Sequence, residues 1–558
     1  MFLFSDLPAL LAGRLLQAPA DPAVPVRHLL LDSRRVGLPA GAVFFALRGP
    51  SHDGHRYLPE LYAQGVRLFV VEEDSKLPGG LAAYPEAGII AVESPLAALQ
   101  TIAAAHRAEF AGPVLAITGS NGKTIVKEWL AQLLSPDEDI CRSPRSYNSQ
   151  VGVPLSVWEL NPERHTLGIF EAGISEVGEM ARLADIIRPT EGIFTTLGTA
   201  HDAGFASAEE KLRQKLRLFQ GPQFQRLFYC RDQAAVRQAV AELGLPGFSW
   251  SRQADDLADI NFAIQDSTSD FTSLQARVAA TGLEASFTLP FADEPSLENA
   301  LHCVAVLLHR QPEPAEIQRR LTRLHPVAMR LEIKLGRHGS YLLDDTYNND
   351  LAGLALALNA LARQSRPGRR TLILSDVLES GLSGEDLYAR VAALLPAAGV
   401  GRLVAIGEEI NQLKVKSEKL KAKSDGPTTE VESVKTQPIT FNSQLLTEFY
   451  PSTEAFLASL DPASFAQETI LVKGARRFGF ERIVAALQAQ QHGTVLEVNL
   501  DALSHNLQHY RRQLQPGTRL MVMVKAFAYG AGSYEVASLL EFQRADYLAV
   551  AYPDEGVA

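Results

Sequence analysis

The 558-residue sequence is poor in cysteine and lacks both long apolar segments and an excess of positive charge. Its three cysteines, Cys141, Cys230 and Cys303, lie far apart, so neither a disulfide framework nor a cysteine-rich metal site is expected. No apolar run approaches the roughly 18 residues that a membrane-spanning helix requires. The N-terminal segment MFLFSDLPALLAGRLL has no basic leading region and contains Asp6, which favours a folded helix over a signal peptide. We therefore expect a cytoplasmic protein without a membrane span.

The charge balance and the length narrow the class of protein further. A net charge of −11 argues against nucleic acid as the main partner, so an anionic ligand would need local lysines and arginines. The hydrophobic fraction of 46% and the charged fraction of 21% are ordinary for a globular protein. The length predicts about three or four domains.

The segment VLAITGSNGKT, residues 114–124, predicts a strand, a glycine turn and the start of a helix. Unpaired N–H groups at such a helix start converge on an anion, and glycine lets the backbone approach phosphate oxygens. Lys123 can reach terminal phosphates, and the Thr124 hydroxyl can hold Mg²⁺. Ile117 stands where the general phosphate loop has its first glycine, so a strand–turn–helix with an exposed lysine is the alternative. The expected phosphate-binding residues are Gly119, Ser120, Asn121, Gly122, Lys123 and Thr124.

Alternating strand and helix patterns predict an α/β protein of three modules, followed by the beginning of a fourth. A small α/β module covers residues 1–95, with expected strands at VFFAL and LFVVEE. A second module covers residues 96–310, where expected strands at VLAIT, TLGIFEAG, GIFTTLG and RLFYC alternate with helices and imply a largely parallel sheet. A third α/β module covers residues 311–490, with expected strands near YLLDDTY, TLILSDV, RLVAIG and TILVKG. Within it, residues 413–440, rich in Lys, Ser and Thr, predict a mobile surface insertion or a charged functional arm. Residues 494–558 begin another strand–helix pattern.

Three polar residues follow the phosphate loop at places where an α/β sheet binds ligands. Glu171 ends the strand LGIFE, His201 follows the strand GIFTTLGTA, and Lys215 lies on a predicted helix. Because ligands bind beyond the carboxyl ends of parallel strands, Glu171 and His201 are candidate Mg²⁺ ligands. Taken singly, each has a plainer interpretation: a helix N-terminal charge, a polar loop residue and a solvated helix lysine, respectively.

In their order along the chain, several motifs resemble those of the Mur ligase family, most closely the MurF type, which joins D-alanyl-D-alanine to UDP-N-acetylmuramoyl-tripeptide. The motifs are GSNGKT (119–124), YNSQVGVPLS (147–156), FEAGISEVGEM (170–180), TTLGTAHDAGFAS (195–207), Lys215, LLDDTYNNDLAG (342–353) and, at the two ends, DSRRV (32–36) and ILVKGARRFGFE (470–481). The resemblance covers roughly residues 1–490. It implies a three-domain architecture: a small α/β uridine-binding domain, a central phosphate-loop domain with a parallel sheet, and a Rossmann-like C-terminal domain.

The resemblance also implies a role for each matching position. ATP and two Mg²⁺ would bind at the phosphate loop, with Lys123 on the phosphates, Glu171 and His201 as metal ligands, and Lys215 as a carbamylated lysine beside the second Mg²⁺. Carbamylation needs a neutral amine, which burial of a lysine favours. Further implied nucleotide contacts are Asn299, Arg330 and Asp345. Implied contacts to the UDP-peptide and to D-alanyl-D-alanine are Ser33, Arg34, Asp53, His55, Asn148, Tyr347, Asn348, Lys473 and Arg476.

The implied reaction is phosphorylation of the tripeptide carboxylate by ATP, followed by attack of the D-alanyl-D-alanine amine on the acyl phosphate. The sequence departs from the family motifs at three places. Pro295-Ser296 replaces a His-Asn pair, which removes one adenine contact from the implied set. YNNDL (347–351) stands for YNANP, and SDVLESG (375–381) stands for GDMxELG.

The last module resembles the beginning of an alanine racemase. Within MVMVKAFAYGAGS (521–533), Lys525 and Tyr529 match the segment whose lysine binds pyridoxal phosphate, whereas Phe527 and Ala531 replace the usual Asn and His. The resemblance implies the start of a β/α-barrel, in which pyridoxal phosphate would bind only if the domain were complete. A barrel needs about 200–250 residues. We therefore expect a fusion with a racemase that is cut short, without racemase activity in this chain.

Two other functions stay open at this point. One is a related ligase with a different acceptor, such as a folylpolyglutamate-type enzyme or another Mur step, against which DSRRV and DDTYNN argue. The other is a phosphate-loop binding module without ligase chemistry. The combination of Glu171, His201 and Lys215 argues against that module.

Overall fold

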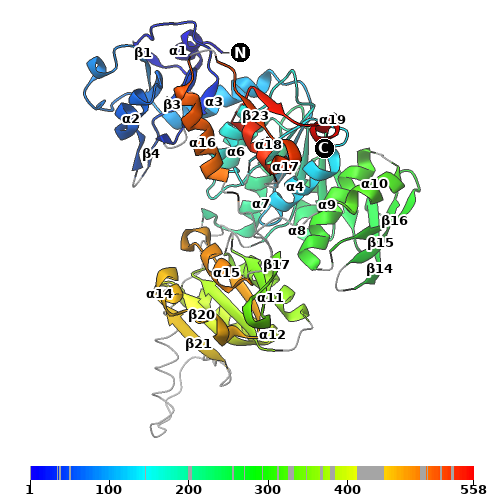
Figure 1. Ribbon diagram of the computed structural model, residues 1–558. Helices are drawn as coiled ribbons and strands as arrows, with labels where there is room; N and C mark the ends of the chain where they lie inside the picture. Colours follow the sequence, from blue (N-terminus) through cyan, green and yellow to red (C-terminus); the bar gives the residue numbers. More distant parts are fainter. Residues whose placement is uncertain are drawn as a thin grey trace, which may run out of the picture. The chain divides into compact units, whose positions relative to one another are not determined.

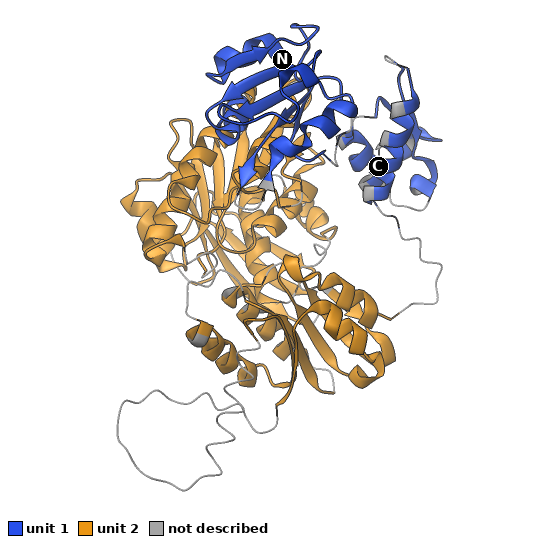
Figure 2. Ribbon diagram, turned by 90° about the vertical axis from the view of Figure 1, so that its left-hand side faces the viewer, with its two compact units in different colours: residues 1–102, 491–558 blue, residues 103–490 orange. Residues whose placement is uncertain are grey.

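The computed structural model describes the chain except residues 1, 34–35, 37–38, 50–51, 145, 199–203, 254–256, 269–270, 292, 311–312, 325–331, 347–348, 365–367, 378–383, 411–444, 490–497, 499, 516–517, 530–532, 544 and 558. It divides into two compact units, residues 1–102 with 491–558, and residues 103–490 (Figure 2). Of the described helices, none combines the length and apolar character of a bilayer-spanning segment. Outside the described residues lie the expected insertion and the candidate site residues Arg34, His201, Arg330, Tyr347 and Asn348.

The N-terminal module is built on a five-stranded sheet in the order β1-β7-β6-β3-β2. Neighbouring strands are parallel except for β1, which is antiparallel to β7. Strand β3 is an apolar run buried along its length, and β6 is apolar and buried up to Val71 and ends at the half-buried Glu72, as is typical of strands in a parallel sheet. The elements are α1 (Leu7–Leu10), β1 (Arg14–Gln17), β2 (His28–Leu30), β3 (Ala42–Phe45), β4 (Arg48–Gly49), β5 (His52–Asp53), α2 (Leu58–Ala63), β6 (Leu68–Glu72), β7 (Gly88–Val92) and α3 (Pro95–Ala108).

The helix expected at the N-terminus is only about one turn long, so that expectation is wrong for most of the segment. Helix α1 ends at Leu10, Ala12 takes a positive φ of 50°, and the chain continues as β1. Gly13 lies against β7, where a Cβ would come within 2.6 Å of Ile90 Cγ2. Pairing with β7 therefore overrides the helical pattern of the apolar residues.

The central module has a nine-stranded sheet in the order β16-β15-β14-β13-β12-β11-β8-β10-β9. The predicted strands at VLAIT, LGIFE, GIF and RLFYC are confirmed as β8, β10, β11 and β12, all parallel to their neighbours. Strands β14, β15 and β16 were not predicted and form an antiparallel extension, which short turns between them permit. The strands are β8 (Val114–Thr118), β9 (Ile140–Arg142), β10 (Leu167–Glu171), β11 (Glu191–Phe194), β12 (Arg226–Cys230), β13 (Gly247–Ser251), β14 (Ile260–Ser267), β15 (Thr272–Val278) and β16 (Glu284–Leu289).

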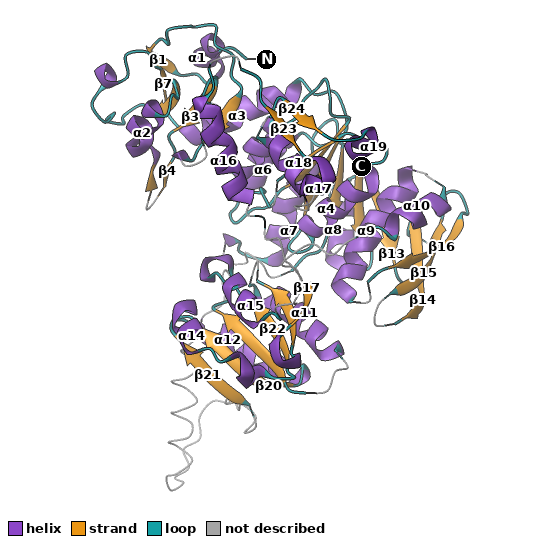
Figure 3. Ribbon diagram, in the orientation of Figure 1, coloured by secondary structure: helices purple, strands orange, loops and turns teal. Residues whose placement is uncertain are grey.

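Helices cover both faces of this sheet (Figure 3). Alternate residues of β8 point to the two faces: Leu115 and Ile117 pack with α4, α9 and α10, whereas Val114 and Ala116 pack with α5 to α8. Because Ile317 and Leu324 belong to the first of these cores, the central module extends beyond the expected boundary at residue 310. The helices are α4 (Lys123–Leu134), α5 (Gly152–Trp158), α6 (Glu179–Ile187), α7 (Ala208–Leu216), α8 (Ala234–Glu242), α9 (Glu294–Arg310) and α10 (Pro314–Leu321).

The third module has a six-stranded sheet in the order β17-β18-β22-β19-β20-β21, parallel except for β17 (Figure 1). The four strands expected here, at YLLDD, TLILS, RLVAI and TILVK, are confirmed as β18, β19, β20 and β22. The elements are β17 (Glu332–Leu335), β18 (Tyr341–Asp345), α11 (Leu351–Arg363), β19 (Arg370–Ser375), α12 (Gly384–Ala397), β20 (Val400–Ile406), β21 (Leu446–Tyr450), α14 (Thr453–Ser459), β22 (Thr469–Lys473) and α15 (Glu481–Leu487).

The C-terminal segment pairs two short parallel strands, β23 and β24, as a strand–helix–strand unit requires. A small core that includes Leu507, Val524 and Leu540 joins its helices. The elements are α16 (Leu500–Gln513), β23 (Met521–Met523), α17 (Lys525–Tyr529), α18 (Ser533–Phe542), β24 (Tyr547–Ala549) and α19 (Pro553–Val557).

A buried polar chain ties helix α9 to the central sheet. Trp250 Nε1 donates to His302 Nδ1 at 3.1 Å, so the other ring nitrogen carries the proton and donates to the Thr195 carbonyl at 3.1 Å. Complete burial lowers the pKa of His302 from 6.5 to about 4. His302 is therefore a neutral side chain that bridges two strands and a helix.

We expect His302 to make the central module less stable in acid. In the unfolded chain His302 binds a proton near pH 6.5, whereas in the folded module it binds one only near pH 4. The contribution of His302 to the free energy of unfolding is therefore complete above pH 6.5 and decreases as the pH falls toward 4. At pH 5 the loss should be about 2 kcal/mol. Urea unfolding at pH 7.5 and pH 5, followed by tryptophan fluorescence, measures it, since all three tryptophans (Trp129, Trp158 and Trp250) lie in this module. His302→Gln should flatten the pH dependence, and an unchanged slope would contradict the assignment.

Candidate functional site

The phosphate loop lies between the carboxyl end of β8 and the first turn of α4. Gly119 has a φ of +143° and Gly122 a φ of +84°, both in the region that favours glycine. A Cβ on Gly119 would come within 2.0 Å of Thr195 Oγ1, and one on Gly122 within 2.2 Å of Asn299 Oδ1. A residue with a side chain at either position would therefore take a strained backbone conformation and displace a neighbouring residue, Thr195 or Asn299.

Two lysines converge on the carbonyl of Gly119. Lys123 Nζ donates to Gly119 O at 2.9 Å and to Ser120 O at 3.0 Å, and Lys215 Nζ donates to Gly119 O at 3.2 Å. Lys215, on α7, is only 1% exposed, so its interpretation as a solvated helix lysine is wrong. Burial, together with the charges of Lys123 and Lys211, lowers the pKa of Lys215 well below its usual value. The site thus holds an amine that is readily neutral.

Glu171 lies at the end of β10, next to β8, with its side chain 0% exposed. Its Oε2 accepts from Thr124 Oγ1 at 3.1 Å, and its Oε1 lies 3.1 Å from Lys127 Nζ. Because α6 begins only at Glu179, Glu171 is not a helix N-terminal charge as the alternative proposed. Lys127 was missed from the sequence, because a lysine one turn after Lys123 and directly before Glu128 gives no sign that its side chain is buried.

The end of β11, on the other side of β8, closes the site. Ser120 N donates to Thr196 O at 2.7 Å, and Thr195 Oγ1 donates to Asn121 O at 2.6 Å. The Gly198 carbonyl accepts from Ser120 Oγ at 3.1 Å and from the buried Lys211 Nζ. These contacts anchor the segment that leads to His201, which itself lies outside the described residues.

The two asparagines expected to contact ligands lie at different parts of the site. Asn299, on α9, is nearly buried and approaches Gly122. Asn148 lies beside Gly173, whose N–H donates to the Asn148 carbonyl at 2.8 Å, two residues after Glu171. The structure therefore brings Asn299 to the phosphate loop and Asn148 to the segment that follows β10.

In the N-terminal module the expected uridine contacts form a local network. His55 Nδ1 lies 2.6 Å from Asp53 Oδ1, and its Nε2 accepts from Glu72 N at 3.1 Å. Hydrogen bonding to His55 lowers the pKa of Asp53. Ser33 is buried. Both ring nitrogens of His55 are thus used within the module, which makes it a support for Asp53.

In the third module, two expected contacts form a buried ion pair. Asp345 and Lys473 end the adjacent parallel strands β18 and β22, at paired positions of the register. Lys473 Nζ lies 2.5 Å from Asp345 Oδ2, and both residues are buried. Arg476 follows on the exposed surface.

In the C-terminal segment, β23 ends at Met523, and only Val524 separates the strand from Lys525. This position, just after a strand, is the one that the resemblance to alanine racemases implies for the lysine. Tyr529 is 62% exposed and, like Ala526 and Ala528, has a positive φ. Glu555 Oε1 accepts from Ala526 N at 3.0 Å.

The described residues contain no group of three or more His, Cys, Asp or Glu placed to hold a metal ion by themselves. What the central site offers is a glycine loop with N–H groups, several ammonium groups and one buried carboxylate beside a threonine hydroxyl. Such an arrangement suits a phosphate ester whose own oxygens complete the shell of a hard divalent cation.

Family models match three parts of the chain. The Mur ligase family catalytic domain matches residues 25–107, the Mur ligase middle domain matches residues 117–307, and the alanine racemase N-terminal domain matches residues 498–558. The two resemblances drawn from the motifs are thereby confirmed.

Curated relatives and solved structures agree with the models. The chain is 30% identical over 398 residues to a UDP-N-acetylmuramoyl-tripeptide–D-alanyl-D-alanine ligase of Synechocystis sp., covering 69% of this chain and 80% of the relative. It is 27% identical over 477 residues to the Escherichia coli enzyme of the same name, covering 83% and 93%. The crystal structure of MurF from Acinetobacter baumannii has a TM-score of 0.69 at 23% identity, covering 87% and 98%. MurF ligase from Thermotoga maritima in complex with ADP has a TM-score of 0.63 at 18% identity, covering 82% and 96%. The three-domain α/β fold class is confirmed.

We expect Gly122→Ala to damage nucleotide binding more than stability alone explains. The substitution strains a φ of +84° and forces Asn299 away, whereas Gly244→Ala meets a φ of +61° in open space and serves as a matched control. Both should lose about 1 kcal/mol of unfolding free energy. Calorimetric titration with ADP should show weaker binding, by about tenfold or more, for Gly122→Ala only. Equal affinities for the two variants would contradict the close packing of Asn299 on the loop.

Proposed function

The chain belongs to the Mur ligase family, and on that premise we propose that it joins D-alanyl-D-alanine to UDP-N-acetylmuramoyl-tripeptide at the expense of ATP, in peptidoglycan precursor synthesis. The observation that carries the proposal is the convergence of Lys123, Lys215 and Glu171 on one phosphate loop. A binding module without chemistry needs the loop, but it does not need a buried, readily neutral amine and a buried carboxylate that both contact that loop. We also propose that the protein works in the cytoplasm, where ATP and UDP-linked precursors are found.

The chain's own residues supply positioning and charge for phosphoryl transfer. The N–H groups of the loop and the start of α4 bind the phosphates, and Lys123, released from the loop carbonyls, neutralises charge on the terminal phosphate. This lowers the repulsion that a substrate carboxylate meets as it approaches. Transfer of the terminal phosphoryl group of ATP to that carboxylate forms an acyl phosphate and releases ADP. The dipeptide amine then attacks the acyl carbon, which forms the amide bond and releases phosphate.

Mg²⁺ fits the oxygen donors at the site. Thr124 Oγ1 and Glu171 Oε2 lie 3.1 Å apart at the end of the loop, and hydroxyl and carboxylate oxygens are the ligands that Mg²⁺ prefers. We assign these two residues, with His201, as the groups that would hold it, and two such ions are expected from the family resemblance. Bound Mg²⁺ would stabilise the charge that develops on the transferred phosphoryl group.

We assign the two substrate ends to the flanking modules. Ser33, Arg34, Asp53 and His55 are proposed for the uridine end, with His55 holding Asp53 in place. Asp345 and Lys473, which form an ion pair, are among the residues proposed to contact the peptide or the nucleotide. The full set of these residues is Asn148, Asn299, Arg330, Asp345, Tyr347, Asn348, Lys473 and Arg476. The C-terminal segment carries no step of this reaction.

We expect Lys123→Ala to abolish turnover. The variant lacks the ammonium group that would face the terminal phosphate, and phosphoryl transfer depends on such charge. ADP release is measured with ATP, the UDP-tripeptide and D-alanyl-D-alanine together, and wild-type release should require all three. Normal turnover by Lys123→Ala would remove the loop from the mechanism. Release that is independent of the dipeptide would favour a ligase with another acceptor.

We expect Lys215 to carry a carbamate. Its amine is buried and its pKa is well below the usual value, so a neutral fraction is available to react with CO₂ near neutral pH. After incubation with ¹³C-bicarbonate, ¹³C NMR should show a carbamate signal in the wild type. Lys215→Arg, which keeps a charge but cannot form this carbamate, should lack the signal and lose activity. A signal of equal size in both proteins would place the modification elsewhere.

A further inference from the structure

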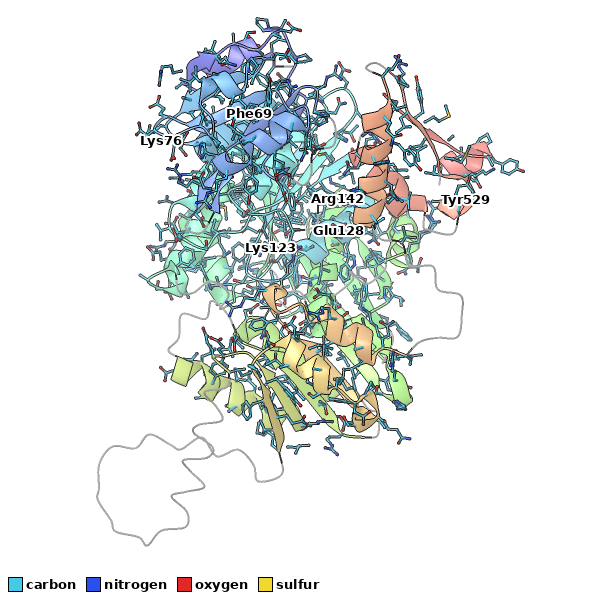
Figure 4. The ribbon with its side chains drawn as sticks, turned by 60° about the vertical axis from the view of Figure 1, so that its left-hand side comes forward. Phe69, Lys76, Lys123, Glu128, Arg142 and Tyr529 are labelled. Atoms are coloured by element: carbon cyan, nitrogen blue, oxygen red, sulfur yellow. The ribbon has the colours of Figure 1, made fainter. Side chains whose placement is uncertain are left out.

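A run of alternating charges joins α4 to the ends of β9 and β10. In order it links Arg142, Glu128, Lys127 and Glu171: Glu128 Oε2 lies 3.1 Å from Arg142 Nε, Glu128 Oε1 lies 2.9 Å from Lys127 Nζ, and Glu171 Oε1 lies 3.1 Å from Lys127 Nζ. Figure 4 shows Glu128 and Arg142 side by side, near Lys123. The side chains of Lys127 and Glu171 are 0% exposed. The run thus begins near the surface and ends inside the phosphate site.

Lys127 is held so that its charge faces Glu171. Its Nζ donates to the Ser143 carbonyl at 2.7 Å, which fixes the ammonium between β9 and β10. Glu171 Oε1 is buried and accepts no directed hydrogen bond from the described residues, so the charge of Lys127 is what stabilises it. A carboxylate removed from water needs such a counter-charge. Lys127 therefore neutralises the same carboxylate that we assign to Mg²⁺.

The other charges of the site add to this effect. Lys123 Nζ lies at Gly119 O, and Lys211 Nζ lies at Gly198 O. A free divalent cation thus meets one neutralised carboxylate among ammonium groups, whereas the phosphates of a nucleotide reverse the sign of the local field.

We propose that Lys127 is a positioning residue that makes cation binding at Glu171 depend on a bound nucleotide. Lys127 holds Glu171 with Oε2 beside Thr124, and its charge repels a cation that arrives without phosphates. The metal then enters together with the nucleotide, so the protein does not hold a divalent cation in an unproductive state. This inference rests on the proposed ATP chemistry of the site.

The test measures Mn²⁺, in place of Mg²⁺, bound to the full chain by electron paramagnetic resonance, with and without ADP. Binding that remains in Glu171→Gln is subtracted as background. The wild type should bind Mn²⁺ about 100-fold more tightly with ADP than without it. Lys127→Gln, which keeps a donor for the Ser143 carbonyl but loses the charge, should bind Mn²⁺ without ADP about tenfold or more tightly than the wild type.

Two controls separate this effect from a general change of charge or stability. Arg142→Gln removes a positive charge from the outer end of the same run, and Lys76→Gln removes one from the exposed surface of the N-terminal module (Figure 4). Both should bind Mn²⁺ as the wild type does. A purely structural role for Lys127 would lower the unfolding temperature of Lys127→Gln and leave its Mn²⁺ affinity unchanged, which would overturn the proposal.

The wild type alone can also overturn it, should Lys127→Gln fail to fold. Equal Mn²⁺ affinity at Glu171 with and without ADP would show that no residue makes the cation depend on the nucleotide. Absence of ADP binding by the wild type has a different meaning, because it would count against the proposed function itself. A third outcome is that the wild type and Lys127→Gln both bind Mn²⁺ with ADP, but Lys127→Gln does not bind Mn²⁺ more tightly than the wild type without ADP. This outcome would refute the role of Lys127 and leave the ligase proposal standing.

Discussion

The backbone of Gly119 is the point on which the central site depends. Its Cα faces Thr195 so closely that a Cβ would lie 2.0 Å from the hydroxyl, and its carbonyl accepts from both Lys123 and Lys215. One peptide group therefore connects the phosphate loop, the end of β11 and helix α7. This connection needs a residue without a side chain, in a conformation that L-residues avoid. The order of the strands, with β8 between β10 and β11, places the remaining groups around it.

Lys127 and Lys215 are both buried at this site, and their surroundings compensate for the loss of water in two different ways. Lys127 Nζ forms ion pairs with two carboxylates, those of Glu128 and Glu171. Lys215 donates to a carbonyl and has no carboxylate partner among the described residues. Burial and the neighbouring charges of Lys123 and Lys211 therefore lower its pKa, which favours the neutral amine. The two lysines lie in the same module and share the residue type, but the sign of the neighbouring charges separates their chemistry.

Much of the fold was predictable because apolar runs and turn residues are local signals. The parallel strands β8, β10, β18 and β22 were expected from such runs, and all were confirmed. The N-terminal helix was wrong because the same apolar residues also satisfy an edge strand, and only pairing with β7 decides between them. The antiparallel strands β14 to β16 and the place of α10 depend on contacts between segments that no short pattern contains.

The candidate site divides in the same way. Sequence by itself determined the residue types, the glycine loop and the family, because these are carried by motifs in a defined order. It left Lys127, Lys211 and His302 unnoticed, since a lone lysine or histidine in a helix has no pattern that distinguishes a buried position from a solvated one. Tertiary structure decided that Lys215 is buried, that Glu171 is paired with Lys127, and that both lie at one loop. The physical reason is that burial and charge pairing arise between strand ends and helices distant in the chain, and those distances exist only once the sheet has formed.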